Sequence, residues 1–208
     1  MTSIREGYME EVGALVALNV RSFAGTLGAS LGDPYQSAFL RYFLRHPDAL
    51  CIVAEEDGAL AGLVYGAPDG YDAALKRELL LPTAASLLRH PRALVHRNFL
   101  PHLLRRIRVR FGRDRHARPD APAPVFDLVG IATAPEHRGR GVARRLLAAF
   151  TEKAFARSYA SVVLDVYVAN TSAVRLYESD GWQILWSDGE VRRYAKLRAS
   201  GCDPVYIA

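Results

Sequence analysis

Cysteine is scarce in this chain of 208 residues, which contains only Cys51 and Cys202. The two are far apart, fit no metal-ligand spacing and are too few for a disulfide framework, so we expect a reduced, cytoplasmic setting and no metal. The sequence also lacks a run of about 18 apolar residues, and Met1 to Glu11 has no apolar stretch of the secretory kind. We therefore expect no membrane partner.

Two nucleotide-binding patterns are missing as well: Gly-x-x-x-x-Gly-Lys-Ser/Thr, and Gly-x-Gly-x-x-Gly after an early strand. Hydrophobic residues make up 50% of the chain and charged residues 24%, which is a globular mixture and excludes a disordered chain. The length predicts a single domain over residues 1–208, with room for an insertion.

Positive charge is concentrated in one segment. Between Leu87 and Arg118 there are ten arginines and one acid, so this stretch carries +9 and the remainder −4, in a chain of net charge +5. A nucleic-acid or membrane-surface binding module using residues 87–118 is therefore the alternative function. We rank nucleic acid below other partners, because only Phe99 and Phe111 in this segment could stack on bases.

The spacing of apolar residues predicts strands and helices in alternation, an α/β (α+β) chain. Strands are expected at 4–5, 49–55, 60–67, 125–133 and 161–169 and as a hairpin over 183–197; helices are expected at 9–20, 35–45 and 141–157, and from Thr171 or Ser172 to Gly181. The Asp57-Gly58 pair between two apolar runs predicts a hairpin turn.

Residues 69–124 differ from the rest, because they are rich in Leu and Arg and are interrupted by Pro82, Pro91 and Pro101. We expect a helical insertion between the third and fourth strands that covers the acceptor side of the site. Its leucines need burial against the core, a second subunit or a lipid surface. A homodimer formed through this insertion is a further expectation.

Residues 131–143, Ile-Ala-Thr-Ala-Pro-Glu-His-Arg-Gly-Arg-Gly-Val-Ala, lead from a buried strand through a glycine-containing loop into an amphipathic helix. A helix N-terminus has unpaired N–H groups and about +0.5 of a charge, which together favour an anion. Gly139 and Gly141 allow a phosphate to approach the main chain, and Arg138 and Arg140 add positive charge. The sequence predicts a phosphate-binding loop; the alternative is a strand-to-helix turn with solvated arginines.

A second motif covers residues 170–182, Asn-Thr-Ser-Ala-Val-Arg-Leu-Tyr-Glu-Ser-Asp-Gly-Trp. Attack of an amine on a thioester expels a thiolate, and a nearby hydroxyl can protonate it. Tyr177 has a reference pKa of about 10, so it carries that proton at neutral pH. The alternative is that Tyr177 packs on a helix face.

Both motifs together resemble signatures of the GNAT superfamily. Residues 138–143 fit the coenzyme A pyrophosphate loop, Gln/Arg-x-x-Gly-x-Gly/Ala, and residues 170–182 fit Asn-x-x-Ala-x-x-Leu-Tyr-x-x-x-Gly-Phe, with Trp182 in the last position. The resemblance covers 125–182 well, 4–67 loosely and the insertion not at all. It implies the GNAT fold, a central mixed, mostly antiparallel sheet flanked by helices. It also implies an acetyl-CoA-dependent N-acetyltransferase that transfers an acetyl or other short acyl group by direct attack of a small-molecule or peptide amine.

The resemblance also implies the cofactor-binding residues, of which the strand residues would bind the pantetheine arm through their backbone. They are Ile131, Ala132, Thr133, Arg138, Gly139, Arg140, Gly141, Val142, Ala143, Asn170 and Tyr177. Asn170 could equally be a turn residue at the start of the helix.

The general base is less clearly marked, because Asp127, Asp165, Glu55 and Glu56 are all acids on or beside expected strands. Asp127 interrupts an apolar strand and is the candidate, although it could instead pair with an arginine. Cys51 is expected to be a small buried hydrophobe rather than a nucleophile.

Overall fold

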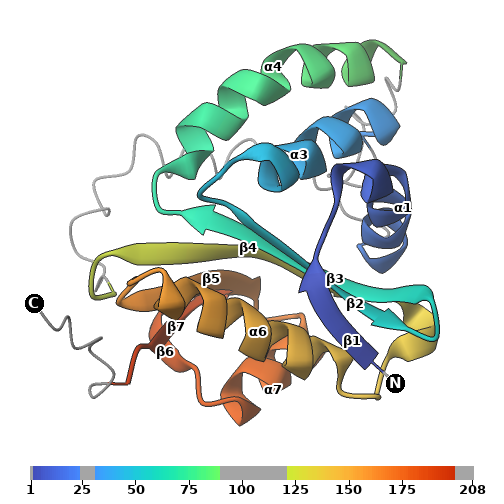
Figure 1. Ribbon diagram of the computed structural model, residues 1–208. Helices are drawn as coiled ribbons and strands as arrows, with labels where there is room; N and C mark the ends of the chain where they lie inside the picture. The colour runs from blue at the N-terminus through green and yellow to red at the C-terminus, as the bar shows by residue number, and fades with distance from the viewer. Residues whose placement is uncertain (1, 24–30, 90–120, 200–208) are drawn as a thin grey trace, which may run out of the picture.

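One seven-stranded sheet organises the chain (Figure 1), in a computed structural model that describes residues 2–23, 31–89 and 121–199. The strand order is β1-β2-β3-β4-β5-β7-β6, and among the described strands only β4 and β5 pair in parallel. The strands are β1 (Thr2–Glu6), β2 (Leu50–Glu56), β3 (Ala59–Pro68), β4 (Val125–Thr133), β5 (Ser161–Tyr167), β6 (Gln183–Ser187) and β7 (Val191–Leu197).

Helices cover both faces of this sheet (Figure 1). On one face lie α1 (Val12–Ser22), α3 (Asp33–Arg45) and α4 (Tyr71–Arg89); on the other lie α6 (Val142–Ala156) and α7 (Thr171–Ser179). Two short 3-10 turns, η1 (Met9–Glu11) and η4 (Pro135–His137), precede α1 and α6. Each face has its own apolar cluster, so the sheet is the shared wall between two cores. We call these the α6 side and the α1 side.

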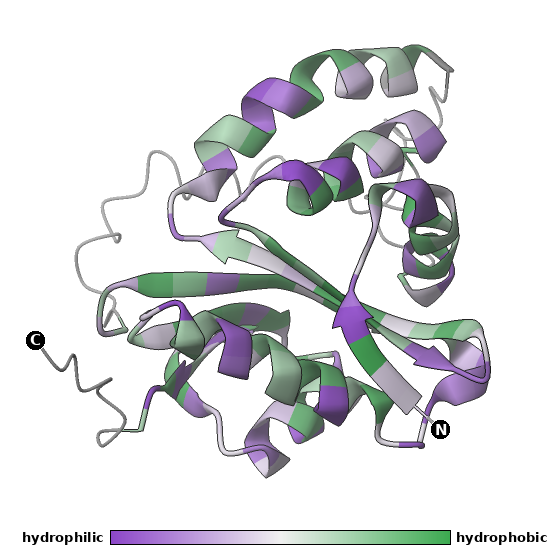
Figure 2. Ribbon diagram, in the orientation of Figure 1, coloured by the Kyte–Doolittle hydropathy of each residue, from purple (hydrophilic) through white to green (hydrophobic). Residues whose placement is uncertain are grey.

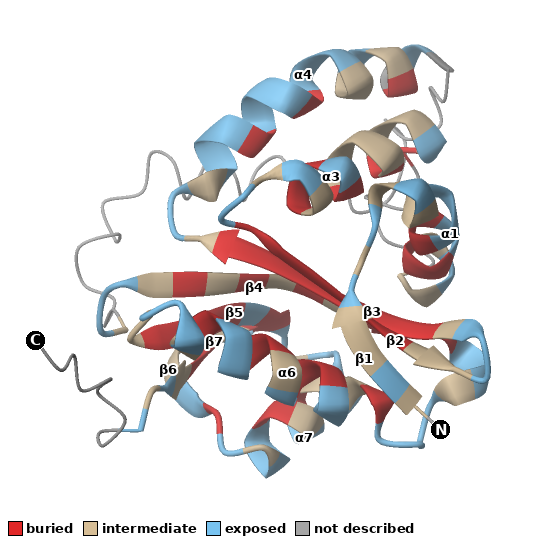
Figure 3. Ribbon diagram, in the orientation of Figure 1, coloured by how far each residue is buried: buried red, intermediate tan, exposed pale blue. Residues whose placement is uncertain are grey.

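The β2–β3 hairpin forms the most buried part of the sheet. Figure 2 shows its strands as largely hydrophobic and Figure 3 shows them as largely buried. Asp57 and Gly58 connect them with φ values of 52° and 78°. Positive φ at both central residues is the geometry that matches the twist of paired strands.

A β-bulge in β4 changes which side chains face each core. Tyr65 pairs with Gly130 and the next residue, Gly66, pairs with Leu128, so Val129 is left over between them. Before the bulge, Phe126 and Leu128 pack on the α6 side; after it, Ala132 packs on the α1 side. Bulges bend and twist a strand, and this one lies where β4 leaves its parallel neighbour.

The expected alternation of elements and the mixed, mostly antiparallel sheet are confirmed. One detail was wrong: the cap of α7 is Asn170, not Thr171 or Ser172. The position of β7 between β5 and β6 had no counterpart in the sequence patterns.

The expected insertion is described only in part. The helix α4 continues through Pro82 and packs against α3, on the α1 side. Leu75 and Leu79 are buried there, whereas Leu80, Leu81 and Leu88 are exposed. Residues 90–120, and with them nearly all of the basic segment 87–118, lie outside the described residues, so the full insertion and a homodimer through it stay predictions.

Candidate active site

The strands β4 and β5 pair over a short length and then separate. Their parallel register ends at Asp127 and Val163, after three residue pairs. Beyond that point β4 pairs only with β3 as far as Thr133, and β5 pairs only with β7. Within the described chain, the β5-facing edge of residues 128–133 therefore has no strand partner. Ile131, Ala132 and Thr133 lie on this free edge, where an extended ligand can bind like an added strand.

The glycine-containing loop follows directly from this edge. Gly139 and Gly141 both have φ of 76°, a left-handed conformation that glycine adopts easily. Gly141 caps α6 without a side-chain hydrogen bond, so the first N–H groups of the helix are open to a ligand. A Cβ at either glycine would meet no atom within 4 Å, which shows that the space above the loop is open. Arg145 Nη2 donates to the Arg140 carbonyl (3.0 Å) and fixes that peptide.

Tyr177 lies on α7 with its ring in the α6-side core. The side chain is 4% exposed, and its ring centroid lies 5.7 Å from that of Trp182 and 5.8 Å from that of Tyr194. Burial raises the pKa of Tyr177 above its usual value, so the hydroxyl stays protonated at neutral pH. The ring therefore packs in the core, as the alternative interpretation holds, and the role of the hydroxyl as general acid stays a prediction.

Asn170 uses its amide oxygen to cap α7. Its Oδ1 accepts from Ala173 N (3.3 Å) and from Ser172 Oγ (3.0 Å). Asn170 is therefore a turn residue at the start of α7, as the alternative interpretation holds. A contact between its NH₂ group and coenzyme A stays a prediction.

Asp127 lies on the opposite side of the sheet from Tyr177. Phe126 and Leu128 face the α6 side, so Asp127 between them faces the α1 side. Its side chain is 17% exposed, and Arg193 Nη2 lies 3.4 Å from Oδ1. Burial raises the pKa of Asp127 to about 6 against the opposing effect of Arg193. The alternative interpretation, a pairing of Asp127 with an arginine, is confirmed. The pairing does not bring the pKa of Asp127 down to its usual value.

Arg193 was not recognised from the sequence. It lies directly opposite Asp165 in the β5–β7 register, and its Nη1 is 3.2 Å from both carboxylate oxygens of Asp165. Side-chain alternation along a strand shows which face a residue is on, but it does not show which strands are neighbours. Only the pairing of β5 with β7 and with β4 brings Arg193 and Asp165 close to Asp127. The acids Asp127, Asp165 and Asp69 outnumber Arg193 here, and both Asp69 and Asp165 raise the pKa of Asp127.

The other acidic candidates have separate partners. Glu55 pairs with Arg5, and Glu56 pairs with His137. Cys51 is buried in β2, and burial raises its pKa to about 12, so it is no thiolate nucleophile at neutral pH. In the ranges that the structure describes, no three His, Cys, Asp or Glu side chains gather in a metal-holding group.

A family model described as the acetyltransferase (GNAT) family matches residues 17–182. The chain belongs to this family. It is thus an acyltransferase that uses acetyl-CoA as its co-substrate, as the two motifs predict. None of the described helices is both long and apolar enough to cross a membrane.

Solved structures share the fold at low sequence identity. A polyamine N-acetyltransferase from Drosophila melanogaster has a TM-score of 0.62 at 15% identity, over 95% of this chain and 100% of that one. A ribosomal-protein-alanine N-acetyltransferase from Brucella melitensis has a TM-score of 0.58 at 18% identity, over 94% of this chain and 99% of that one. The PaiA N-acetyltransferase of Thermoplasma acidophilum, solved with coenzyme A, has a TM-score of 0.56 at 13% identity, over 95% of this chain and 99% of that one. No protein of curated function matches the sequence.

Proposed function

We propose that this GNAT acetyltransferase transfers an acetyl group to a primary amine of a small-molecule or peptide acceptor, which attacks acetyl-CoA directly while both are bound. The observation that carries the proposal is the separation of β4 and β5 after Asp127, since it leaves a free strand edge that leads into the open glycine-containing loop. The polyamine and ribosomal-protein-alanine acetyltransferases that share the fold act on amines, which supports an amine acceptor.

Coenzyme A binds along this edge and loop in the proposal. The N–H groups of residues 138–143 hold the pyrophosphate at the N-terminus of α6, and Arg138 and Arg140 add charge. The backbone of Ile131, Ala132 and Thr133 binds the pantetheine arm, which the NH₂ group of Asn170 also contacts.

The acid and the base approach the reacting atoms from opposite sides of the sheet. As the amine nitrogen bonds to the acetyl carbon and the carbon–sulfur bond breaks, Asp127 takes the proton from nitrogen and the Tyr177 hydroxyl protonates the departing sulfur. Solvent then returns a proton to Tyr177 and removes one from Asp127. A neutral thiol and an amide are the products.

The acceptor enters from the α1 side, where Asp127 lies. Three aspartates and one arginine give that region a negative balance, which favours a protonated amine over an acidic acceptor. Asp127 deprotonates the bound ammonium to produce the nucleophile and releases this proton to solvent, so that it is ionised again when the amine attacks.

The test combines coenzyme A binding with an acceptor screen. Calorimetry measures coenzyme A affinity, and polyamines, aminoglycosides and short peptides with free N-termini are screened by release of free thiol. Mass spectrometry must show the acetyl group on an acceptor nitrogen. A folded protein that fails to bind coenzyme A contradicts the proposal, and so does acetylation of oxygen alone.

A further inference from the structure

Glu56 is the last residue of β2, and its carboxylate lies between the edge of the sheet and the start of the coenzyme A loop. Its Oε1 accepts from Thr2 Oγ1 (2.8 Å), and its Oε2 lies 2.6 Å from His137 Nδ1. The side chains of Glu56 and His137 are only 13% and 14% exposed. Arg140 of the loop is a weaker third neighbour, with Nη1 3.5 Å from Oε2.

The ionisation of Glu56 follows from its hydrogen bonds. Those from Thr2 and His137 lower the pKa of Glu56, so it is an ionised carboxylate that can only accept. His137 Nδ1 is therefore the donor of the hydrogen bond, and Glu56 Oε2 is its acceptor. Because Thr2 and Glu56 are opposite each other in the β1–β2 register, the hydroxyl of Thr2 holds the carboxylate from the edge strand.

His137 ends the 3-10 turn η4, and Arg138 follows it as the first loop residue. The turn is held to the sheet through the backbone, because His137 N donates to Ala134 O (2.9 Å) and Ala134 N donates to Ala61 O (2.9 Å). The bond from His137 to Glu56 adds a side-chain tie to β2. The residue just before the loop is thus fixed to two neighbouring strands, while the loop itself lies in open space.

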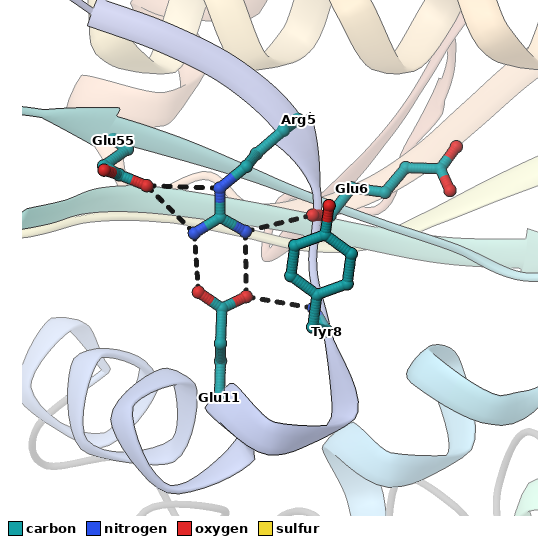
Figure 4. Close-up of polar contacts among 5 residues, drawn as sticks. All are labelled: Arg5, Glu6, Tyr8, Glu11 and Glu55. Atoms are coloured by element: carbon teal, nitrogen blue, oxygen red, sulfur yellow. Dashed lines mark hydrogen bonds and ion pairs between the residues drawn. The ribbon is translucent and has the colours of Figure 1, made fainter. Parts of the chain in front are cut away.

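The preceding residue has a different role. Glu55 points to the α1 side, where it holds the guanidinium of Arg5 together with Glu11 (Figure 4). That cluster ties β1, β2 and η1 to one another and makes no contact with the loop. Two adjacent glutamates therefore serve separate parts of the molecule.

We infer that Glu56 is a positioning residue for coenzyme A: through its hydrogen bond with His137 it holds the 138–143 loop in the conformation that binds the pyrophosphate. The inference rests on the proposed function, because it assigns that loop to coenzyme A. Glu56 favours coenzyme A binding through the loop conformation and not through its charge, because a negative charge beside a phosphate site by itself weakens anion binding.

The test compares Glu56→Ala, Glu56→Gln and the neighbour Glu55→Ala. Glu56→Ala should weaken coenzyme A binding roughly 10-fold, because a misplaced binding group loses affinity steeply. The turnover number at saturating acetyl-CoA and the KM for the acceptor should stay within about twofold. Glu56→Gln should bind as the wild type does, because its amide oxygen can accept from His137 and its NH₂ can donate to the Thr2 hydroxyl. Glu55→Ala should lower the melting temperature and leave coenzyme A affinity unchanged.

A second variant covers the case in which Glu56→Ala does not fold. His137→Phe fills a similar volume without the hydrogen bond and should reproduce the loss of coenzyme A affinity. Wild-type affinity in folded Glu56→Ala and His137→Phe overturns the inference and leaves the proposed function standing. Glu56→Gln as weak as Glu56→Ala also overturns it, because the charge and not the geometry would then matter. If the wild-type chain itself binds no coenzyme A, the proposed function fails first.

Discussion

Arg193 Nη2 lies 3.4 Å from Asp127 Oδ1, yet the pKa of Asp127 is raised to about 6 instead of lowered. Burial disfavours the charged carboxylate more than the guanidinium favours it, and Arg193 also serves Asp165. A carboxyl with this pKa is largely ionised at neutral pH and still takes up a proton readily. This is the range in which a general base works best at neutral pH.

The pKa of Asp127 predicts the acid limb of the pH profile. The ionised form is the active base, so kcat/KM should fall as the pH drops through about 6. Asp127→Asn should lower kcat/KM by roughly 100-fold or more, as is typical for loss of a general base, and should remove that limb. Steady-state rates from pH 5 to 8 with the identified acceptor measure both effects. An Asp127→Asn enzyme that keeps the wild-type limb would show that another group causes it.

Loss of the Tyr177 hydroxyl should affect turnover and not coenzyme A binding. Tyr177→Phe keeps the ring contacts with Trp182 and Tyr194, so the fold should persist. Turnover should fall roughly 100- to 10,000-fold, the range for loss of a general acid. Tyr159→Phe is the matched control, because Tyr159 packs on Phe126 beyond the far end of α6. Turnover of Tyr177→Phe within about threefold of the wild type would identify Tyr177 as a packing residue.

Local patterns in the sequence predicted the elements well, because each depends on residues close in the chain. The two apolar runs and the Asp57-Gly58 pair between them predicted the β2–β3 hairpin. The order of strands was harder: β7 lies between β5 and β6, and the bulge at Val129 depends on how β3 and β4 align. Strand pairing joins distant segments, and periodicity carries no information about the partner.

The candidate site divides in the same way. The phosphate loop and Tyr177 belong to contiguous motifs, so they could be named in advance. The side-chain pairs beside the site join residues that are remote in sequence, so no local pattern could predict them. Arg193 is 66 residues from Asp127, and His137 is 81 residues from Glu56. Asp127 was suspected because it interrupts an apolar strand, but its raised pKa depends on burial that only the fold shows.

Arg5 should stabilise the fold without serving the site. Its guanidinium is held by Glu11 through two hydrogen bonds and by Glu55, and it stacks on the Tyr8 ring (Figure 4). Arg5→Ala leaves both half-buried carboxylates without this partner, so the free energy of unfolding should fall by about 1–3 kcal/mol in urea titrations. Lys153→Ala, which breaks the exposed pair with Glu6, should cost less than about 1 kcal/mol. Equal losses from both variants would contradict the assigned role of Arg5.

A side chain at Gly141 should weaken coenzyme A binding more than it weakens the fold. Gly141→Val places a β-branched residue at a φ of 76°, which by itself costs on the order of 1–3 kcal/mol. Gly189→Val is the matched control, because Gly189 has a φ of 87°, lies in the β6–β7 turn and also has open space at its Cβ. Both variants should therefore lose similar stability in urea. Only Gly141→Val should lose coenzyme A affinity, by roughly 10-fold or more in calorimetry, because its side chain occupies the space where the phosphate approaches the N–H groups of α6. Unchanged affinity in a folded Gly141→Val protein would remove the loop from the coenzyme A site.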